Sequence, residues 1–135
     1  MGKVEKTTTT LEKVHKAAKC YYENKGYNVI DMDFKTKYSK LGLVAMTPDE
    51  SVIVFVKVLV EKDIDKGMPK AKRPSSAERQ LLEKKAADYL IDHNYVDVAI
   101  RFDEFATLII DEKKGRAMVR CHVNWFGEDE IIGDD

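Results

Sequence analysis

The distribution of apolar and polar residues divides the chain into two helical and five strand-like segments. Apolar residues recur at helical spacing in 10–25 and 77–93, after residues that favour a helix N-cap, Thr9 and then Ser75 or Ser76. The strand-like runs lie at 27–34, 41–46, 51–60, 98–110 and 117–126. The pattern predicts an α/β sandwich with the order α-β-β-β-α-β-β, in which helices flank a mixed central β-sheet.

The run 51–60, SVIVFVKVLV, is apolar at almost every position. A strand of this kind is covered on both faces, so we expect it at the centre of the sheet. The exception is Lys57, which has no acidic residue beside it in the sequence. Alternation places Phe55, Lys57 and Leu59 on one face of the strand, and a charge on that face requires an explanation.

The composition is that of one domain, which we expect to span residues 1–127 and to be followed by an acidic tail at 128–135. The chain has 135 residues, of which 44% are hydrophobic, and a net charge of −1. Residues 1–90 include 18 basic and 13 acidic residues, whereas 91–135 include 5 and 11, which favours a basic surface on the first two-thirds. No apolar run approaches about 18 residues, and the start of the chain lacks the apolar core of a signal peptide. We therefore expect a cytoplasmic protein without membrane contact.

Several short motifs follow one another in an order that one protein family shares. They are A-x-x-Y-Y and G-Y at 18–22 and 26–27, A-x-x-Y-L at 86–90, R-F-D at 101–103 and N-W-F at 124–126. With these motifs the chain resembles, from about Val14 to Phe126, the YraN-type proteins of bacteria. The resemblance implies an endonuclease-like domain with the restriction-endonuclease-like fold of Holliday junction resolvases.

The chemical motifs of that family are G-E on the first helix, G-E-I-D-L-I on the second strand and V-F-V-E-V-K on the third. In nucleases of this fold the strand carboxylates hold Mg²⁺, the lysine lies beside the attacking water or scissile phosphate, and the helix glutamate completes the acidic cluster. The matching positions in this chain, in the order Glu, Asp, Glu and Lys, are His15, Gly42, Lys57 and Leu59. An ammonium group cannot coordinate Mg²⁺, so the resemblance implies a degenerate site without metal or other cofactor.

Lys57 then has two interpretations: it occupies the former metal position, or it snorkels to water at the edge of the sheet. A cation in place of a carboxylate–metal pair favours phosphate, so we expect a non-catalytic pseudo-nuclease that binds DNA or another nucleic acid, or acts as a scaffold. The residues expected to contact phosphate are Lys40, Lys57, Lys70, Lys72, Arg73 and Arg79. Those at 70–73 belong to a segment with Gly and Pro, 62–74, that we expect to be a flexible loop, and solvation there explains them equally well.

Two other functions remain open. A metal-dependent endonuclease or resolvase with a migrated site would bind Mg²⁺ through Asp33, Glu61 and Asp103, whereas a structural Asp103 would pair with Arg101 or a loop lysine. A protein–protein interaction module would use the acidic tail, Glu128–Asp135. Analogy with resolvases of this fold, and nothing else, suggests a homodimer.

Overall fold

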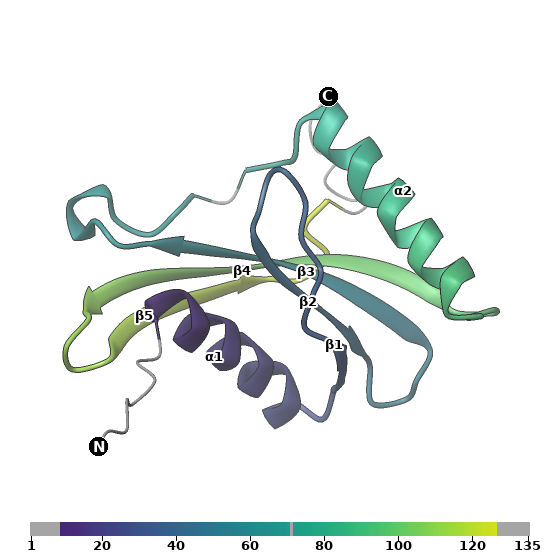
Figure 1. The fold of residues 1–135 in the computed structure, drawn as a ribbon, viewed down its shortest axis with the longest axis horizontal. Coiled ribbons are helices and arrows are strands. Elements are labelled where there is room, and N and C mark those ends of the chain that lie inside the picture. Colours follow the sequence, from purple (N-terminus) through teal and green to yellow (C-terminus); the bar gives the residue numbers. More distant parts are fainter. Residues whose placement is uncertain (1–8, 71, 127–135) are drawn as a thin grey trace, which may run out of the picture.

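The computed structural model describes residues 9–70 and 72–126, which form a five-stranded mixed sheet with a helix on each face (Figure 1). The elements in chain order are α1 (Thr10–Asn24), β1 (Asn28–Asp31), β2 (Leu41–Met46), β3 (Val52–Glu61), the 3₁₀ helix η1 (Ile64–Lys66), α2 (Ser76–Asp92), β4 (Ala99–Asp111) and β5 (Arg116–His122). The predicted order of helices and strands is confirmed, and η1 is an addition to it.

The strands lie side by side in the order in which they occur in the chain. β1, β2 and β3 form an antiparallel meander, β4 pairs with β3 in parallel, and β5 returns antiparallel to β4. The parallel pair is connected through α2, as a crossover between parallel strands requires. β3 is the third of the five strands, so the prediction that the apolar run 51–60 forms the centre of the sheet is confirmed.

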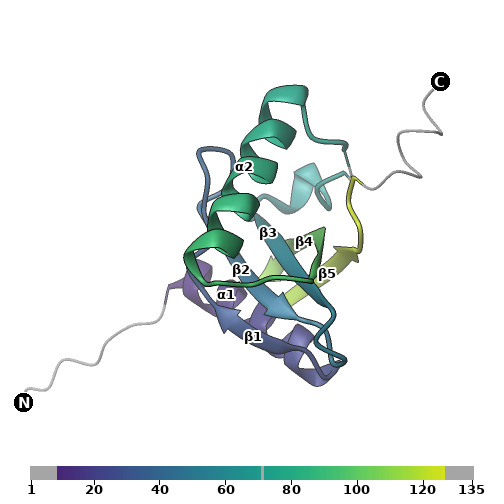
Figure 2. The same cartoon turned by 90° about the vertical axis from the view of Figure 1, so that its right-hand side faces the viewer.

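Two apolar cores lie on opposite faces of the sheet, one under α1 and one under α2 (Figure 2). β3 contributes to both, because Val54, Val56 and Val58 pack towards α1 whereas Ile53 and Phe55 pack towards α2. All five of these side chains are buried. Burial of each stabilises the fold by roughly 1.5–3 kcal/mol, and this explains the nearly continuous apolar run.

Both helices begin after the residues that suit an N-cap. Thr9 and Glu12 form a complete capping box, in which each side chain accepts a hydrogen bond from the backbone N–H of the other. Ser75 accepts a bond from the N–H of Glu78 in the same way. The carboxylate of Glu78, however, reaches the sheet and bonds a side chain of β3.

β1 is shorter than the predicted run 27–34. The pairing of β1 with β2 shifts register between Val29 and Asp31, and the last pair joins Asp31 to Val44. Residues 32–40, here termed the strap, leave the sheet and run on its α2 side. Phe34 of the strap is buried in the α2-side core, and Lys85 of α2 donates a hydrogen bond of 2.7 Å to the carbonyl of Lys35.

The segment between β3 and α2, expected to be a flexible loop, contains η1 and is held at two points by polar side chains. Arg120 donates to the carbonyl of Pro69 at 2.6 Å, and the indole N–H of Trp125 donates to the carbonyl of Lys72 at 2.7 Å. Both donors lie in or just after β5. The part of this segment that precedes α2 is therefore attached to the sheet.

Candidate functional site

The four positions that the resemblance assigns to a metal site lie on two faces of the sheet, with His15 on the α1 side and Lys57 on the α2 side. The Nε2 atom of His15, on α1, lies 2.7 Å from the carbonyl oxygen of Gly42, and Gly42 pairs with Lys57 across β2 and β3. Leu59 lies two residues further along β3 on the same face as Lys57 and is half-buried. His15 contacts only the backbone of Gly42, and its imidazole is separated by the sheet from the ammonium group of Lys57.

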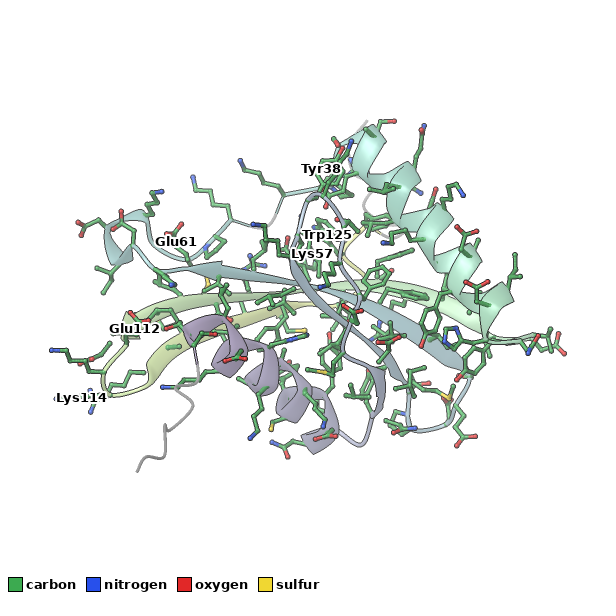
Figure 3. The ribbon with its side chains drawn as sticks, viewed as in Figure 1. Tyr38, Lys57, Glu61, Glu112, Lys114 and Trp125 are labelled. Carbon is green, nitrogen blue, oxygen red and sulfur yellow. The ribbon has the colours of Figure 1, made fainter. Side chains whose placement is uncertain are left out.

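Lys57 forms a buried ion pair with Glu78, which lies in the first turn of α2, three residues after Ser75. Lys57 Nζ lies 2.7 Å from Glu78 Oε2, and the two side chains are only 13% and 8% exposed. The same ammonium lies over the ring of Trp125, 4.7 Å from its centroid (Figure 3). The snorkelling interpretation is wrong: β3 is the central strand, and Lys57 has its acidic partner inside the fold.

The ion pair belongs to a larger polar group on the α2 side of the sheet, here termed the Lys57 cluster. Its members are Lys57, Glu78, Glu104, Arg120 and Trp125. Glu104 is adjacent to Lys57 in the parallel pairing of β3 and β4, and Arg120 Nη2 lies 3.4 Å from its carboxylate. Burial raises the pKa of Glu104, while Arg120 and Lys57 act in the opposite direction. Two cations thus balance two carboxylates, which lowers the cost of burying each charge.

The backbone of the strap closes the space beside Gly42. A Cβ atom added at Gly42 would lie 2.1 Å from the carbonyl oxygen of Phe34 and 2.6 Å from that of Val56. The aspartate that the resemblance implies therefore does not fit while the strap keeps this position. The remaining cavity, which Phe34, Lys57 and Leu82 help to line, has a volume of about 10 Å³, at the lower limit for one water molecule.

Asp103 lies on the opposite face of the sheet, where it is fully buried and bonded to three partners. Arg101 donates two bonds of 2.9 Å, the hydroxyl of Tyr22 donates one of 2.7 Å, and the backbone N–H of Asn124 donates one of 2.9 Å. The expected pairing with Arg101 is confirmed. Burial, followed by the charge of Asp103, raises the pKa of Tyr22, so this hydroxyl stays protonated and donates.

The carboxylates of the migrated-site alternative do not come together. Asp103 faces α1, whereas Glu61 shares the face of Lys57 and lies at the end of β3. Asp33 is exposed in the strap and pairs with Lys35. Among residues 9–70 and 72–126, no group of three or more His, Cys, Asp or Glu side chains is arranged to hold a metal ion.

The predicted phosphate-contacting residues lie in different environments. Lys40, Lys70, Lys72 and Arg73 are exposed. Arg79 is half-buried, pairs with Glu83 at 3.3 Å and lies over the ring of Phe126. Lys57 is enclosed in its cluster. The acidic tail, Glu128–Asp135, lies outside the described residues.

Sequence reasoning missed the partners of Lys57. Glu78 lies three residues after Ser75, which is the spacing of a capping-box glutamate. This spacing suggests a role at the helix N-terminus and does not indicate that the carboxylate reaches the core. Glu104 carried no signal, and Trp125 entered only as part of the N-W-F motif. Their proximity to Lys57 depends on the parallel pairing of β3 with β4 and on the turn after β5. The one signal in the sequence was Lys57 itself, a charged residue in the middle of an apolar strand.

The fold and site together define a small α/β protein in which an ion pair occupies the position expected for a metal. A family model described as "Uncharacterised protein family UPF0102" matches residues 14–107. The chain belongs to this family, which the YraN-type motifs had indicated.

Individual relatives agree with the family model. A UPF0102 protein of Pelobacter propionicus is 31% identical over 109 residues, covering 81% of this chain and 76% of the relative. A UPF0102 protein of Caldanaerobacter subterraneus subsp. tengcongensis is 29% identical over 128 residues, covering 93% and 100%. In the part of the chain that the structure describes, neither helix is long and apolar enough to cross a bilayer.

Proposed function

We propose that this protein is a cytoplasmic, non-catalytic member of its family that binds nucleic acid through exposed cations and without a metal ion. The observation that carries the proposal is the Lys57–Glu78 ion pair, at the position where the resemblance implies a metal-binding glutamate. An ammonium group has no lone pair to offer a cation. Its charge also repels Mg²⁺ at close range.

The residues around the ion pair also argue against a bound metal ion. Lys57 is bonded to Glu78 and covered by Trp125, and the Phe34 carbonyl occupies the space that an aspartate at position 42 would need. A metal-dependent reaction at this point would require the strap to move and the ion pair to break. In this proposal the buried residues around Lys57 stabilise the fold, and the exposed cations bind nucleic acid.

The exposed cations near this site support binding to a polyanion. Lys70 and Lys72 are exposed in a segment whose carbonyls, at Pro69 and Lys72, are bonded to Arg120 and Trp125. Cations on an attached segment lose less conformational entropy on binding than cations on a free loop. Contacts between lysine and backbone phosphates carry no base specificity, so we expect weak sequence preference.

Electrophoretic mobility shifts with linear and branched DNA, in EDTA and in Mg²⁺, test the proposal. We expect binding at low salt that does not depend on Mg²⁺, and no cleavage products in either buffer. The double substitution Lys70→Ala and Lys72→Ala should weaken binding about tenfold or more, by loss of two phosphate contacts. The matched control replaces Lys113 and Lys114, two exposed lysines in the turn between β4 and β5, and should bind as the unmodified protein does.

Two results would overturn the proposal. Product formation that requires Mg²⁺ would support the nuclease alternative. Absence of any shift at low salt would leave the protein–protein interaction module as the remaining function.

A further inference from the structure

The last described residues of the chain lie beside the cations that are proposed to bind nucleic acid. Phe126 is buried, and its ring stacks on that of Phe102 with the centroids 4.7 Å apart. Trp125 donates from its backbone N–H to the carbonyl of Phe102 at 2.6 Å, and from its indole to the carbonyl of Lys72. In Figure 2 the end of the described chain, in yellow, lies next to the segment that leads into α2. The point from which the acidic tail, 128–135, continues is therefore fixed against this segment.

A half-open pocket of about 260 Å³ lies at the same point. Its wall is formed by the start of α2, the residues before it and the last described residue: Arg73, Pro74, Ser76, Arg79 and Phe126. This wall carries two guanidinium groups, and none of its described residues is acidic. Cζ of Arg79 lies 5.3 Å from the centroid of the Phe126 ring, and its Nε contacts the exposed Glu83. A guanidinium has five N–H donors, so Arg79 can bind a further carboxylate.

The sequence that continues from Phe126 is complementary in charge to this pocket. It reads GEDEIIGDD, with acidic residues at 128, 129, 130, 134 and 135. A chain spans at most about 3.6 Å per residue, so residues 128–130 lie within about 14 Å of Phe126. A ligand on so short a tether has an effective concentration of millimolar order, which populates even weak contacts. The covalent connection thus supplies the pocket with an anionic occupant.

We propose that the acidic tail of the same chain docks in this pocket, with carboxylates of residues 128–130 against Arg73 and Arg79, and competes there with nucleic acid. Lys70 and Lys72 belong to the same segment as Arg73, so phosphates bound by these lysines would meet the negative charge of the docked tail. The competition rests on the proposed function, whereas the docking does not. The tail lowers the affinity for nucleic acid until a polyanion displaces it.

Amide chemical shifts of the ¹⁵N-labelled full chain test the docking without any added ligand. The tail variant neutralises three acids at once: Glu128→Gln, Asp129→Asn and Glu130→Gln. At low salt this variant should shift the amides of Ser76 and Ala77, which are far from the tail in sequence. About 1 M NaCl should remove the difference, because it screens contacts between exposed charges. The matched control neutralises three exposed acids that do not line the pocket, and should leave both amides unchanged: Glu50→Gln, Asp92→Asn and Asp97→Asn.

The same two variants test the competition by mobility shifts with linear DNA in EDTA. The tail variant should bind at least about tenfold more tightly than the unmodified protein, because the phosphates no longer displace a tethered anion. The control changes the net charge by the same amount and should gain less than about threefold. Equal gains from the two variants would overturn the competition, because net charge alone would then explain them.

The amide shifts decide the docking whatever the DNA assay shows. Amides of Ser76 and Ala77 that do not respond to the tail variant would overturn it. A response that grows with protein concentration would overturn it too, because the tail would then occupy the pocket of a second copy. A response that is independent of concentration, in a protein of which no variant binds DNA, would support the docking and overturn the proposed function.

Discussion

Lys57 shows how a strand that is apolar on both faces accommodates a charge at its middle. Its side chain extends from β3 towards α2, where the ammonium bonds Glu78 and lies over the ring of Trp125. The pair is buried, so its members depend on each other. An ammonium that loses its carboxylate inside the fold keeps the cost of burial without the compensating attraction.

Glu78→Gln should therefore lower the free energy of unfolding by on the order of 3 kcal/mol, measured by urea denaturation. Replacement of both partners, Lys57→Met with Glu78→Leu, should recover most of this loss, because the buried charges disappear together. Glu83→Gln is the matched control: it breaks an exposed pair with Arg79 and should cost less than about 0.5 kcal/mol. Equal effects of Glu78→Gln and Glu83→Gln would show that Lys57 does not depend on Glu78.

The pH dependence of stability reports on Glu104 in the same cluster. Burial raises its pKa above the ordinary value of 4.5, so the folded protein retains the proton to higher pH than the unfolded chain does. Its contribution is present below the unfolded pKa and is lost as pH rises through the folded pKa. The stability of Glu104→Gln relative to the unmodified protein should thus increase between about pH 4 and pH 7, as measured by urea denaturation across that range. A difference that stays constant, or that decreases with pH, would contradict the assignment.

At the scale of elements, the second strand and the strap form one unit. Gly42 is the only residue of β2 without a side chain, and the Phe34 and Val56 carbonyls lie where a Cβ would stand. The glycine thus permits the strap to cross against the sheet, and Phe34, Thr36 and Ser39 of the strap line a small cavity beside Lys57. Packing therefore requires a residue without a side chain at position 42. The resemblance, which implies an aspartate there, does not account for this requirement.

Gly42→Ala should lower the free energy of unfolding by about 3 kcal/mol, because the clash is with backbone atoms that cannot rotate away. Gly115→Ala is a useful comparison: that glycine has a φ of +68° but nothing within 4 Å of an added Cβ. It should cost about 1 kcal/mol from backbone strain alone. If denaturation shows that the two alanine variants are equally stable, the Phe34 carbonyl does not lie against Gly42.

The elements were predictable from the sequence to the extent that their signals are local. The run 41–46 became β2 at the predicted residues, and Thr9 and Ser75 cap the two helices. β1 was predicted too long, because the slip in its alternation is a register shift whose consequence, the departure of the strap, depends on packing against α2. The attachment of the β3–α2 segment was missed for a similar reason: its anchors, Arg120 and Trp125, come from the other end of the chain.

At the scale of the whole molecule, the sheet separates two polar groups with different roles. The Asp103 network on the α1 side joins α1, β4 and the turn after β5, and the Lys57 cluster on the α2 side joins β3, α2, β4 and β5. The resemblance to the YraN-type proteins singled out position 57 of the sheet. It could not indicate which residue of α2 would neutralise Lys57, because that contact depends on how the helix crosses the strands.

The most direct test of the account is the slope of DNA-binding affinity against salt concentration, measured by fluorescence anisotropy in EDTA. For double-stranded DNA we expect binding in EDTA without Mg²⁺, with log K falling linearly with log salt by about 0.9 for each phosphate contacted. Lys70→Ala with Lys72→Ala should reduce the slope by about 2, whereas Lys113→Ala with Lys114→Ala should leave it unchanged. Affinity that appears only with Mg²⁺, or a slope that responds equally to both pairs of substitutions, would contradict binding through this surface.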